Sequence, residues 1–589
     1  MSSILSQFSY FDGSTQIYII SASIITPLSF IVIFKNFKRY KKTNELSTIL
    51  INTCLIILNF NAWVFLVWSL RQNQERLNKT PLQREILDLK FQNVNIPGFS
   101  FLNYQDNVVS NSNEDDSKLE EKFSCSSIQN SNQVSIEASE LVDLNKEGDL
   151  RFIRNQLKDL SPNNKAYQLC FQDGEHQSED DILKKKWFKF CGSAVWMSKY
   201  QVYFMVSRVI YSRNARKNLP TISILYGQIF DKNWKELKHY KFPNSELIFP
   251  TILPHEIDLG KRTKKEVLGS EDPRIILNEY IKDGELFQEP VIVFSSRRTE
   301  INWARAMHTY QPLTNSKKIT RMAIKDKKRS FIEKNWAPFF DRNKDDDNGK
   351  YINFIYNFNP LRIIKCDLQN GECNKVSGPP FNSISANDNA GKLRGGTNII
   401  EIPIEFLPTN NLTNDRKYWI GIGRSHINSC GCLQELYRPH IFLMSRLKTK
   451  TESFQLDYVS SLIDFNINPE SWYERKIPKS TCQDGKSVLI PNSISYWEFN
   501  NKENIDYMGI TFSEADRTNK LLHVRGLLKH IHNLFEITNG DQKLGNDENN
   551  NQDNNQDQFE KDEKSKLLGE CSTFLSNDYC ENTKKLLNW

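Results

Sequence analysis

The four-residue run Glu271-Asp272-Pro273-Arg274 combines the residue types that proton-transfer chemistry requires. It places two carboxylates and a guanidinium within four positions, and Pro273 fixes the backbone just before a β-type run. A carboxylate accepts a hydroxyl proton best when burial raises its pKa, whereas a neighbouring guanidinium lowers that pKa, and the sequence does not rank the two effects. The alternative is a surface turn closed by an ion pair within the run, because short motifs are weakly specific.

Two other patterns have the form of metal sites. Asp345-Asp346-Asp347 has the Asp-x-Asp spelling of a divalent-metal site, but it lies in a hydrophilic run before an expected strand, which favours a solvated hairpin loop. The pair Cys430 and Cys432 has neither a second close cysteine pair nor a histidine pair beside it, so it is weak evidence for zinc. The sequence therefore predicts no metal site and no cofactor.

The chain has eleven cysteines, and Cys54 lies in an apolar run without an obvious partner. Cys366 and Cys373 flank a short polar stretch, a spacing that suits a disulfide-closed β-turn, and we expect the other eight to pair across longer loops. A reduced set is the alternative. The sequons at Asn78 and Asn411 fit an oxidising compartment as well.

The formal net charge of the 589-residue chain is only +6, and charges of both signs are scattered along it. This balance argues against nucleic acid as a partner. The length alone does not fix the number of domains.

Residues 1–70 have the pattern of a membrane anchor. Two apolar runs, at about 17–34 and 46–70, are long enough to span a bilayer, and a basic cluster between 35 and 42 separates them. The positive-inside rule keeps that cluster in the cytosol, so the rest of the chain is expected in the lumen. The alternative, a cleaved signal peptide, lacks a small-residue cleavage site.

The remainder divides by composition. Residues 71–181 are polar and are expected to form a stem with a partly folded lead-in, 182–535 a β domain, 536–566 a disordered Asn/Asp-rich segment, and 567–589 a segment that docks back through Cys571 or Cys580. Short strand-like stretches dominate the β domain, and they are separated by Asn-, Gly-, Asp- and Pro-bearing turns. This favours a mainly β fold, a propeller first and a sandwich second. No strict repeat fixes a blade number. The clearest strand-like stretches are 201–210, 290–295, 351–358, 418–422, 440–445, 454–462, 486–490, 507–512 and 521–527.

Ordered motif blocks between about 191 and 528 resemble a known family, the fungal β-mannosyltransferases that build β-1,2-linked mannose on cell-wall mannan. The blocks include the segment 269–277, Glu333 to Phe339, Arg394-Gly395-Gly396-Thr397, Gly423-Arg424-Ser425-His426, Tyr437-Arg438-Pro439, 489–495 and Ser513 to Asp516. Several blocks also resemble, more distantly, the five-bladed propeller enzymes that phosphorolyse or hydrolyse β-mannosides. That second resemblance implies five blades. Together with the apolar runs and the polar stretch, the expected architecture is a propeller-like β domain preceded by transmembrane helices and a polar stem.

The family resemblance implies an enzyme that transfers mannose from GDP-mannose with inversion. It implies Asp272 as the base, with Glu271 exchanging roles with it or holding a mannose hydroxyl, and Asp516 binding sugar hydroxyls or orienting a cation. Cations are expected around the leaving diphosphate, and Asn335 and Tyr437 are expected to bind substrate. Alternatives stay open: Arg438 ties down a loop, and His426 is a structural histidine. The expected cations are Arg208, Arg274, Lys334, His426 and Arg438.

The same resemblance implies a Golgi membrane enzyme with its catalytic domain in the lumen. The acceptor would be a mannan oligosaccharide or a mannosylated glycoprotein or glycolipid. A β-mannoside phosphorylase or hydrolase is the second hypothesis, and a non-catalytic glycan-binding paralogue is the third. Two anchor helices and the Asn/Asp-rich tract depart from the usual family pattern.

Overall fold

A computed structural model of the chain describes residues 89–102, 125–130, 135–535 and 564–582, with gaps at 175, 244, 261–265, 283, 315–317, 326, 328–329, 343–348, 382–392, 409–410, 431–432, 473–485, 501–502, 573–574 and 577–578. All of the described residues belong to one compact unit, Lys79–Trp589. The two predicted anchor helices, Asp345 to Asp347 and most of the Asn/Asp-rich segment lie outside the described residues. Within the described ranges, no helix has the length and apolarity needed to cross a bilayer.

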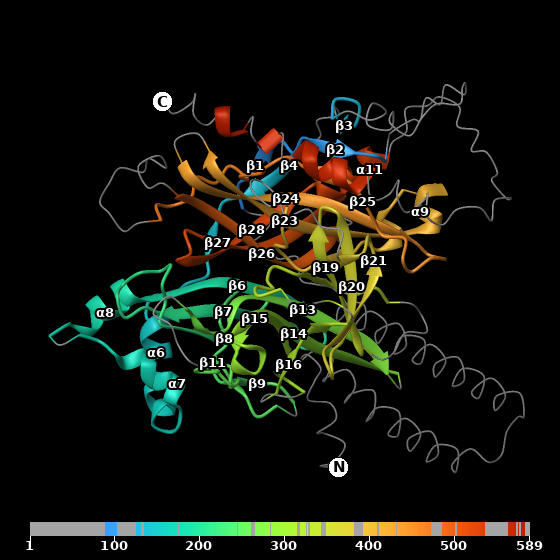
Figure 1. The fold of residues 1–589 in the computed structure, drawn as a ribbon. Coiled ribbons are helices and arrows are strands. Elements are labelled where there is room, and N and C mark those ends of the chain that lie inside the picture. The colour runs from blue at the N-terminus through green and yellow to red at the C-terminus, as the bar shows by residue number, and fades with distance from the viewer. Residues whose placement is uncertain are drawn as a thin grey trace, which may run out of the picture. The chain divides into compact units, whose positions relative to one another are not determined.

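The fold is mainly β, as the sequence predicts (Figure 1). Three sheets formed from residues 187–377 are separate in their hydrogen bonding. Sheet 1 contains, in pairing order, β11 (Thr251–Ile252), β8 (Ile222–Phe230), β7 (Val202–Tyr211) and β6 (Trp187–Met197), with β12 (Leu268–Gly269) parallel to β8. Sheet 2 contains β13 (Glu271–Lys282), β14 (Glu285–Arg298), β15 (Ala304–Tyr310) and β16 (Ile319–Arg321). Sheet 3 contains β17 (Ala323–Ile324), β21 (Glu372–Ser377), β20 (Leu361–Asp367), β19 (Tyr351–Phe358) and β18 (Ala337–Phe339).

The remaining large sheet has twelve strands and consists of two halves, which we name sheets 4 and 5. They are joined where Glu435–Tyr437 pairs in parallel with Lys486–Val488. Sheet 4 contains β22 (Ile400–Glu401), β23 (Arg416–Cys430), β24 (Leu433–Leu447), β25 (Gln455–Ser460), β2 (Gly98–Ser100) and β3 (Gln129–Asn130). Sheet 5 contains β26 (Lys486–Asn500), β27 (Ile505–Glu514), β28 (Thr518–Arg525), β4 (Ile136–Ser139), β1 (Phe91–Val94) and β5 (Val142–Asp143). A separate two-stranded ribbon contains β9 (Tyr240–Lys241) and β10 (Ile248–Phe249).

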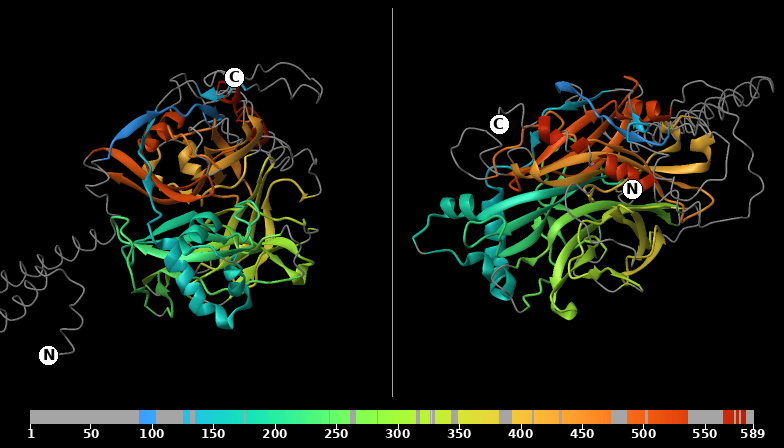
Figure 2. Two further views of the ribbon diagram at one scale, coloured as in Figure 1. Left: turned by 90° about the vertical axis from the view of Figure 1, so that its left-hand side faces the viewer. Right: turned by 45° about the horizontal axis from the view of Figure 1, so that its top comes forward.

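Helices are short and peripheral. The first two α-helices along the chain, α6 (Asp149–Leu160) and α7 (Lys165–Gln168), lie beside sheet 1 in both views of Figure 2. Ile153 and Leu157 of α6 pack there against Trp187 and Ile224. The α-helices include α6 (Asp149–Leu160), α7 (Lys165–Gln168), α8 (Glu179–Lys186), α9 (Asn411–Asp415) and α11 (Leu527–Phe535), and residues 564–572 are helical as well. The 3₁₀-helices are η2 (Ser161–Asn163), η3 (Leu169–Phe171), η4 (Thr299–Ile301) and η6 (Ile404–Phe406).

Each sheet shares an apolar core with the next one along the chain, and sheet 5 shares one with sheet 1. Strands β6, β7 and β8 are buried on both faces, which explains their near-continuous apolar runs. The cores contain Phe204, Phe294 and Ile275 between sheets 1 and 2, Val291 and Phe354 between sheets 2 and 3, Phe339 and Trp419 between sheets 3 and 4, Ile420 and Ile510 between sheets 4 and 5, and Met205 and Tyr496 between sheets 5 and 1.

Three disulfides are present among the described residues. Cys366–Cys373 closes the turn between β20 and β21, which confirms the sequence prediction. Cys125–Cys571 and Cys430–Cys580 fix the carboxyl-terminal segment to the rest of the unit, as expected for that segment. The expectation that every other cysteine pairs was wrong, because Cys170 and Cys191 are buried thiols without a cysteine partner.

Candidate active site

The Glu-Asp-Pro-Arg run is the start of strand β13, and it is not a surface turn. Glu271 and Arg274 are each only 6% exposed. The register between β13 and β14 shifts between Glu271 and Arg274, a bulge that redirects side chains at this point. Asp272 sits in the bulge with φ 52°, a left-handed conformation that L-residues adopt at a cost. The bulge and the strained backbone at Asp272 therefore set the direction of its carboxylate.

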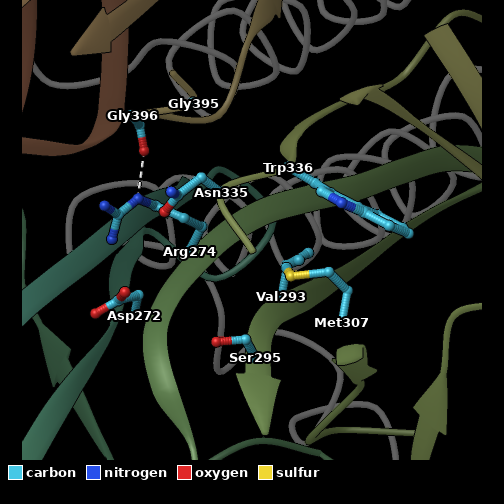
Figure 3. Close-up of a pocket in the computed structure, with 9 residues that line it drawn as sticks. All are labelled: Asp272, Arg274, Val293, Ser295, Met307, Asn335, Trp336, Gly395 and Gly396. Carbon is cyan, nitrogen blue, oxygen red and sulfur yellow. Dashed lines mark hydrogen bonds between the residues drawn. The ribbon is translucent and has the colours of Figure 1, made fainter. Parts of the chain in front are cut away.

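The ion-pair partner of both carboxylates is Arg208 on β7, and it is not Arg274. Nη1 of Arg208 lies 2.9 Å from Oδ1 of Asp272, and Nη2 lies 3.1 Å from Oε2 of Glu271. Nε of Arg208 donates to Ser223 Oγ at 2.9 Å, so all three guanidinium nitrogens are held. Arg274 instead donates its Nε to the Gly396 carbonyl (Figure 3). Its Nη1 donates to the Pro273 carbonyl.

Glu271 has a second cationic partner that the sequence did not indicate. Nη2 of Arg305 on β15 lies 2.6 Å from Oε1 of Glu271. Because Glu271 bridges Arg208 and Arg305 and is nearly inaccessible, it is suited to holding the two guanidinium groups in place. No local pattern around Arg305 signals this role, since the contact depends on how β15 lies beside β13.

Asp272 is the accessible member of the pair, with a third of its side chain exposed. Burial works to raise the pKa of Asp272, but the charges of Arg208, Arg424, Arg274 and Arg305 outweigh it and lower the pKa to about 2. The structure thus ranks the two effects that the sequence left open. Asp272 is a permanent carboxylate at neutral pH.

Asp516, in the turn between β27 and β28, has the opposite behaviour. Burial and the negative charge of Asp272 raise its pKa to about 6, against the lowering influence of Lys217, Arg208 and Arg424. Asp516 also has a left-handed φ, of 47°. Two neighbouring carboxylates with pKa values pushed apart are typical of sites that transfer a proton.

Asn335 and a glycine pair bring sheets 2, 3 and 4 together beside Asp272. Asn335, with φ 63°, accepts a hydrogen bond from Nη2 of Arg424 at 2.8 Å. A Cβ on Gly395 would lie 2.3 Å from the Asn335 carbonyl oxygen, so only glycine allows this approach. Figure 3 shows Asp272, Arg274 and Asn335 grouped around a small pocket whose wall includes Gly395 and Gly396.

Lys334 and the pair His426 and Tyr437 lie within the electrostatic field of the same cluster. Loss of water and the charges of Arg305, Arg424 and Arg394 lower the pKa of Lys334, and Asp272 opposes them. His426 stacks on Tyr437 with ring centroids 4.2 Å apart. Burial first, and then neighbouring cations, lower the pKa of His426, which favours the neutral ring.

Arg438 is held mainly by the main chain. Its Nη1 donates to the Tyr437 carbonyl at 2.9 Å, and its Nη2 donates to Ser487 Oγ at 2.9 Å, which ties β24 to β26. These contacts fit the structural alternative for Arg438. Its place around a leaving diphosphate stays a prediction.

Cys191 is a buried residue of the site that the sequence did not single out. Its Sγ lies 4.0 Å from Oδ1 of Asp272. Burial and the charge of Asp272 raise the pKa of the Cys191 thiol to about 11, so it remains protonated and contributes packing. Among the described residues, no group of three or more His, Cys, Asp or Glu side chains is placed to hold a metal ion.

The decisive comparison is with a family whose sequence model, described as beta-mannosyltransferases, matches residues 124–316 and 305–579. The chain belongs to the β-mannosyltransferase family. It is 44% identical to Beta-mannosyltransferase 3 of Candida albicans over 98% of this chain and 99% of that one. It is 33% identical to Beta-mannosyltransferase 3 of Komagataella phaffii over 66% of this chain and 61% of that one. The family resemblance read from the motif blocks is confirmed, and the chain is a mannosyltransferase.

The similarity to solved structures is too weak to support an assignment. The catalytic domain of a Coprinopsis cinerea GH62 α-L-arabinofuranosidase aligns over 60% of this chain and 94% of that chain, with a TM-score of 0.28 and 10% identity. That score is too low to support a conclusion about fold or function. The β-mannosyltransferase assignment therefore rests on sequence, and the geometry of the site is independent of it.

Proposed function

We propose that this β-mannosyltransferase transfers mannose from GDP-mannose, with inversion, to a hydroxyl of a mannan-type acceptor and forms a β-1,2-mannoside. The observation that carries the proposal is the excess of cations around Asp272. Among the described residues, four cations make no salt bridge with a carboxylate: Arg274, Lys334, Arg394 and Arg424. The charges of Arg274, Lys334 and Arg424 interact with the charge of Asp272. Cations crowded together without counter-charges provide a site for an anionic group such as a diphosphate.

The leaving group accounts for these cations. When the bond between the anomeric carbon and the phosphate oxygen breaks, its electron pair stays on the diphosphate, whose negative charge increases. Arg424 and Lys334 are suited to receive that charge, because Lys334 is exposed and Arg424 is fixed by Asn335. Loss of water is the largest cause of the lowered pKa of Lys334, and the charges of Arg305, Arg424 and Arg394 lower it further, as expected beside a group of cations.

The two carboxylates account for the acceptor side. An α-linked donor gives a β-linked product when the acceptor hydroxyl attacks the anomeric carbon from the face opposite the phosphate. The proton of that hydroxyl passes to Asp516, whose pKa of about 6 lets it act as a base at neutral pH. Asp272, held ionised by Arg208, stabilises the positive charge that develops on the sugar and binds its hydroxyls. This assigns the base to Asp516, where the sequence had favoured Asp272.

For the fold we propose a five-bladed propeller. Five mainly antiparallel sheets follow one another along the chain, and five apolar cores join sheets 1 to 2, 2 to 3, 3 to 4, 4 to 5 and 5 to 1. β4, from the amino-terminal side of sheet 1, pairs with β28 of the last sheet, which is how a radial sheet array is closed by its first strand. An experimental structure with an open side between two of these sheets would contradict the proposal.

For location we propose a Golgi membrane protein with the β domain in the lumen, acting on mannosylated glycoproteins or glycolipids in cell-wall biosynthesis. The three disulfides support an oxidising compartment. The apolar runs at 17–34 and 46–70 support membrane attachment. Release of the full-length protein by alkaline carbonate would contradict the attachment.

The test is incubation of the full-length protein with GDP-mannose and an α-mannan oligosaccharide. We expect GDP release matched by one new mannose per GDP, with a β-1,2 linkage identified by NMR. Phosphate-dependent release of mannose 1-phosphate from β-mannosides, without transfer from GDP-mannose, would instead show a phosphorylase.

A further inference from the structure

A second cavity, which the proposed reaction does not use, lies where sheets 1, 2, 4 and 5 meet. Its volume is about 440 Å³, within the range of ~300–1,000 Å³ typical of small-molecule sites. Its wall includes five aromatic side chains contributed by β6, by the segment after β18, by η6 and by β26. They are Trp196, Phe340, Phe406, Tyr496 and Trp497.

This cavity is separated from the candidate active site along the strands. Strand β13 runs from Asp272 to Leu277 between the two, and β6 runs from Cys191 to Trp196. The two linings come closest at Arg274 and Ile276, two positions or about 7 Å apart on β13, and no residue lines both cavities. The two sites are therefore distinct.

Polar groups are interspersed with the aromatic rings of the cavity. Glu279, Glu401, Arg342 and Asn398 line it together with the rings. Glu401 is 41% exposed on its side chain and lies 3.4 Å from Lys417 Nζ, so the carboxylate remains accessible. Asn398 is only 2% exposed and bonds the main chain of Ile494 through both ends of its amide, so the charged side chains supply the acceptors and donors at the edges of the flat apolar surfaces.

One lining group lacks a protein partner. The indole N–H of Trp196 is buried, and no hydrogen-bond acceptor for it exists among the described residues. A buried donor without a partner costs free energy, but protein atoms cover this N–H, so a ligand oxygen would reach it only after a shift of the Trp196 ring.

We propose that this cavity binds a neutral saccharide segment, one to three hexose units long, independently of the catalytic site. Sugar rings present apolar C–H faces that fit aromatic rings, and their hydroxyls fit carboxylate and guanidinium groups. Glu279 and Glu401 are balanced by Arg342 and by Lys417, which pairs with Glu401, so the lining has no excess of positive charge to attract a phosphate or another anion. The polar groups disfavour a purely apolar ligand, since they would lose water without compensation. The site would hold a distant part of the glycan that the enzyme extends.

The test is hydrogen–deuterium exchange of the purified full-length protein, in a detergent without a sugar head group, with and without α-mannotetraose. We expect protection of peptides covering residues 398–406 and 494–497, and the same protection in Asp272→Asn, because the cavity does not depend on the reaction. Phe406→Ala and Glu401→Gln should each reduce the affinity of this site for the saccharide roughly tenfold, because each variant loses one stacking or hydrogen-bonding contact.

Ile404→Ala is the matched control, because Ile404 is in the same 3₁₀-helix, is 55% exposed and does not line the cavity. It should keep full protection. If mannotetraose protects only peptides around 271–274 and 334–336, or if Glu401→Gln, which removes no packing, leaves the protection unchanged, the proposal is wrong. Equal protection by glycerol at matched concentration would also overturn it.

Discussion

The carboxylate of Asp272 lies 2.9 Å from Nη1 of Arg208, yet a third of the Asp272 side chain is exposed whereas the Arg208 side chain is 9% exposed. The cation is thus part of the wall, and the carboxylate faces the substrate space. Glu271 fixes the other side of the same guanidinium at 3.1 Å. The Asp272 carboxylate is held by a buried cation on one side and is exposed to the substrate on the other, which is what a preorganised site requires.

Asp516 should set the acid limb of the pH profile. Its pKa is about 6, and a base must be deprotonated, so kcat/KM should rise with pH through about 6 and then level off. In Asp516→Asn the rate should fall by about 10²–10⁴, and this limb should disappear from the residual activity. An unchanged limb in Asp516→Asn, measured by initial rates between pH 4.5 and 8, would assign the proton acceptor elsewhere.

Arg305 should matter as a positioning residue. Its loss leaves Oε1 of Glu271 without its 2.6 Å partner and removes one of the cations that lower the pKa of Asp272. We expect Arg305→Gln to reduce kcat/KM about 10–100-fold and to raise the pKa of Asp272, which appears as a lower activity at acid pH.

Arg321→Gln is the control for Arg305, since Arg321 forms a more exposed pair with Glu300 at 2.9 Å. Exposed pairs contribute little, so this variant should retain activity within about twofold. Equal losses in the two variants would mean that Arg305 acts only through general stability.

His308 should make stability depend on pH. Burial lowers the pKa of His308 to about 3, so the unfolded chain, where the pKa is about 6.5, binds the proton more readily. The contribution of His308 is therefore complete above pH 6.5 and is lost as pH falls toward 3, at about 1.4 kcal/mol per pH unit.

The measurement is denaturant unfolding of the wild type and His308→Gln at pH 7, 5.5 and 4.5. The free energy of unfolding of the wild type, relative to that of the variant, should fall by about 2.5 kcal/mol between pH 7 and 4.5. A constant difference across this range would contradict a buried neutral imidazole.

The disulfides should contribute unequally to the free energy of unfolding. Cys430–Cys580 spans 150 positions and Cys366–Cys373 spans 7, so loop-closure entropy predicts about 5 kcal/mol for the first and about 2.5 kcal/mol for the second. Cys580→Ala should therefore lower the unfolding midpoint more than Cys373→Ala. The reverse order would show that the carboxyl-terminal segment contributes little to the folded unit.

Much of the strand content was predictable. The stretch 351–358 is β19 with the same bounds, and 201–210 is shifted by one residue from β7. Apolar β-branched and aromatic runs between turn residues carry that information locally. The pairing of the sheets was not predictable, because no repeat marks the blades, and sheet 5 takes β1, β4 and β5 from residues assigned to a polar stem.

The candidate site was predictable only in part. Asp272, Asn335 and Asp516 belong to recognisable motif blocks, and the structure brings them together. Arg305 and Lys217 were missed, because an arginine in a strand or a lysine in a loop has no local pattern that reveals a partner. Lys217, which contacts Trp472 and the Ala515 carbonyl at 2.7 Å, lies about 300 positions from its partner next to Asp516.

Replacing the Asp272 carboxylate by an amide of the same shape tests the whole account most directly. We would measure β-mannosyl transfer from GDP-mannose to a mannan oligosaccharide by Asp272→Asn, with the exposed Asp180→Asn as control. The account predicts a loss of at least about 10²-fold in kcat for Asp272→Asn with a folded protein, and wild-type transfer for Asp180→Asn. Wild-type transfer by a folded Asp272→Asn protein would contradict it.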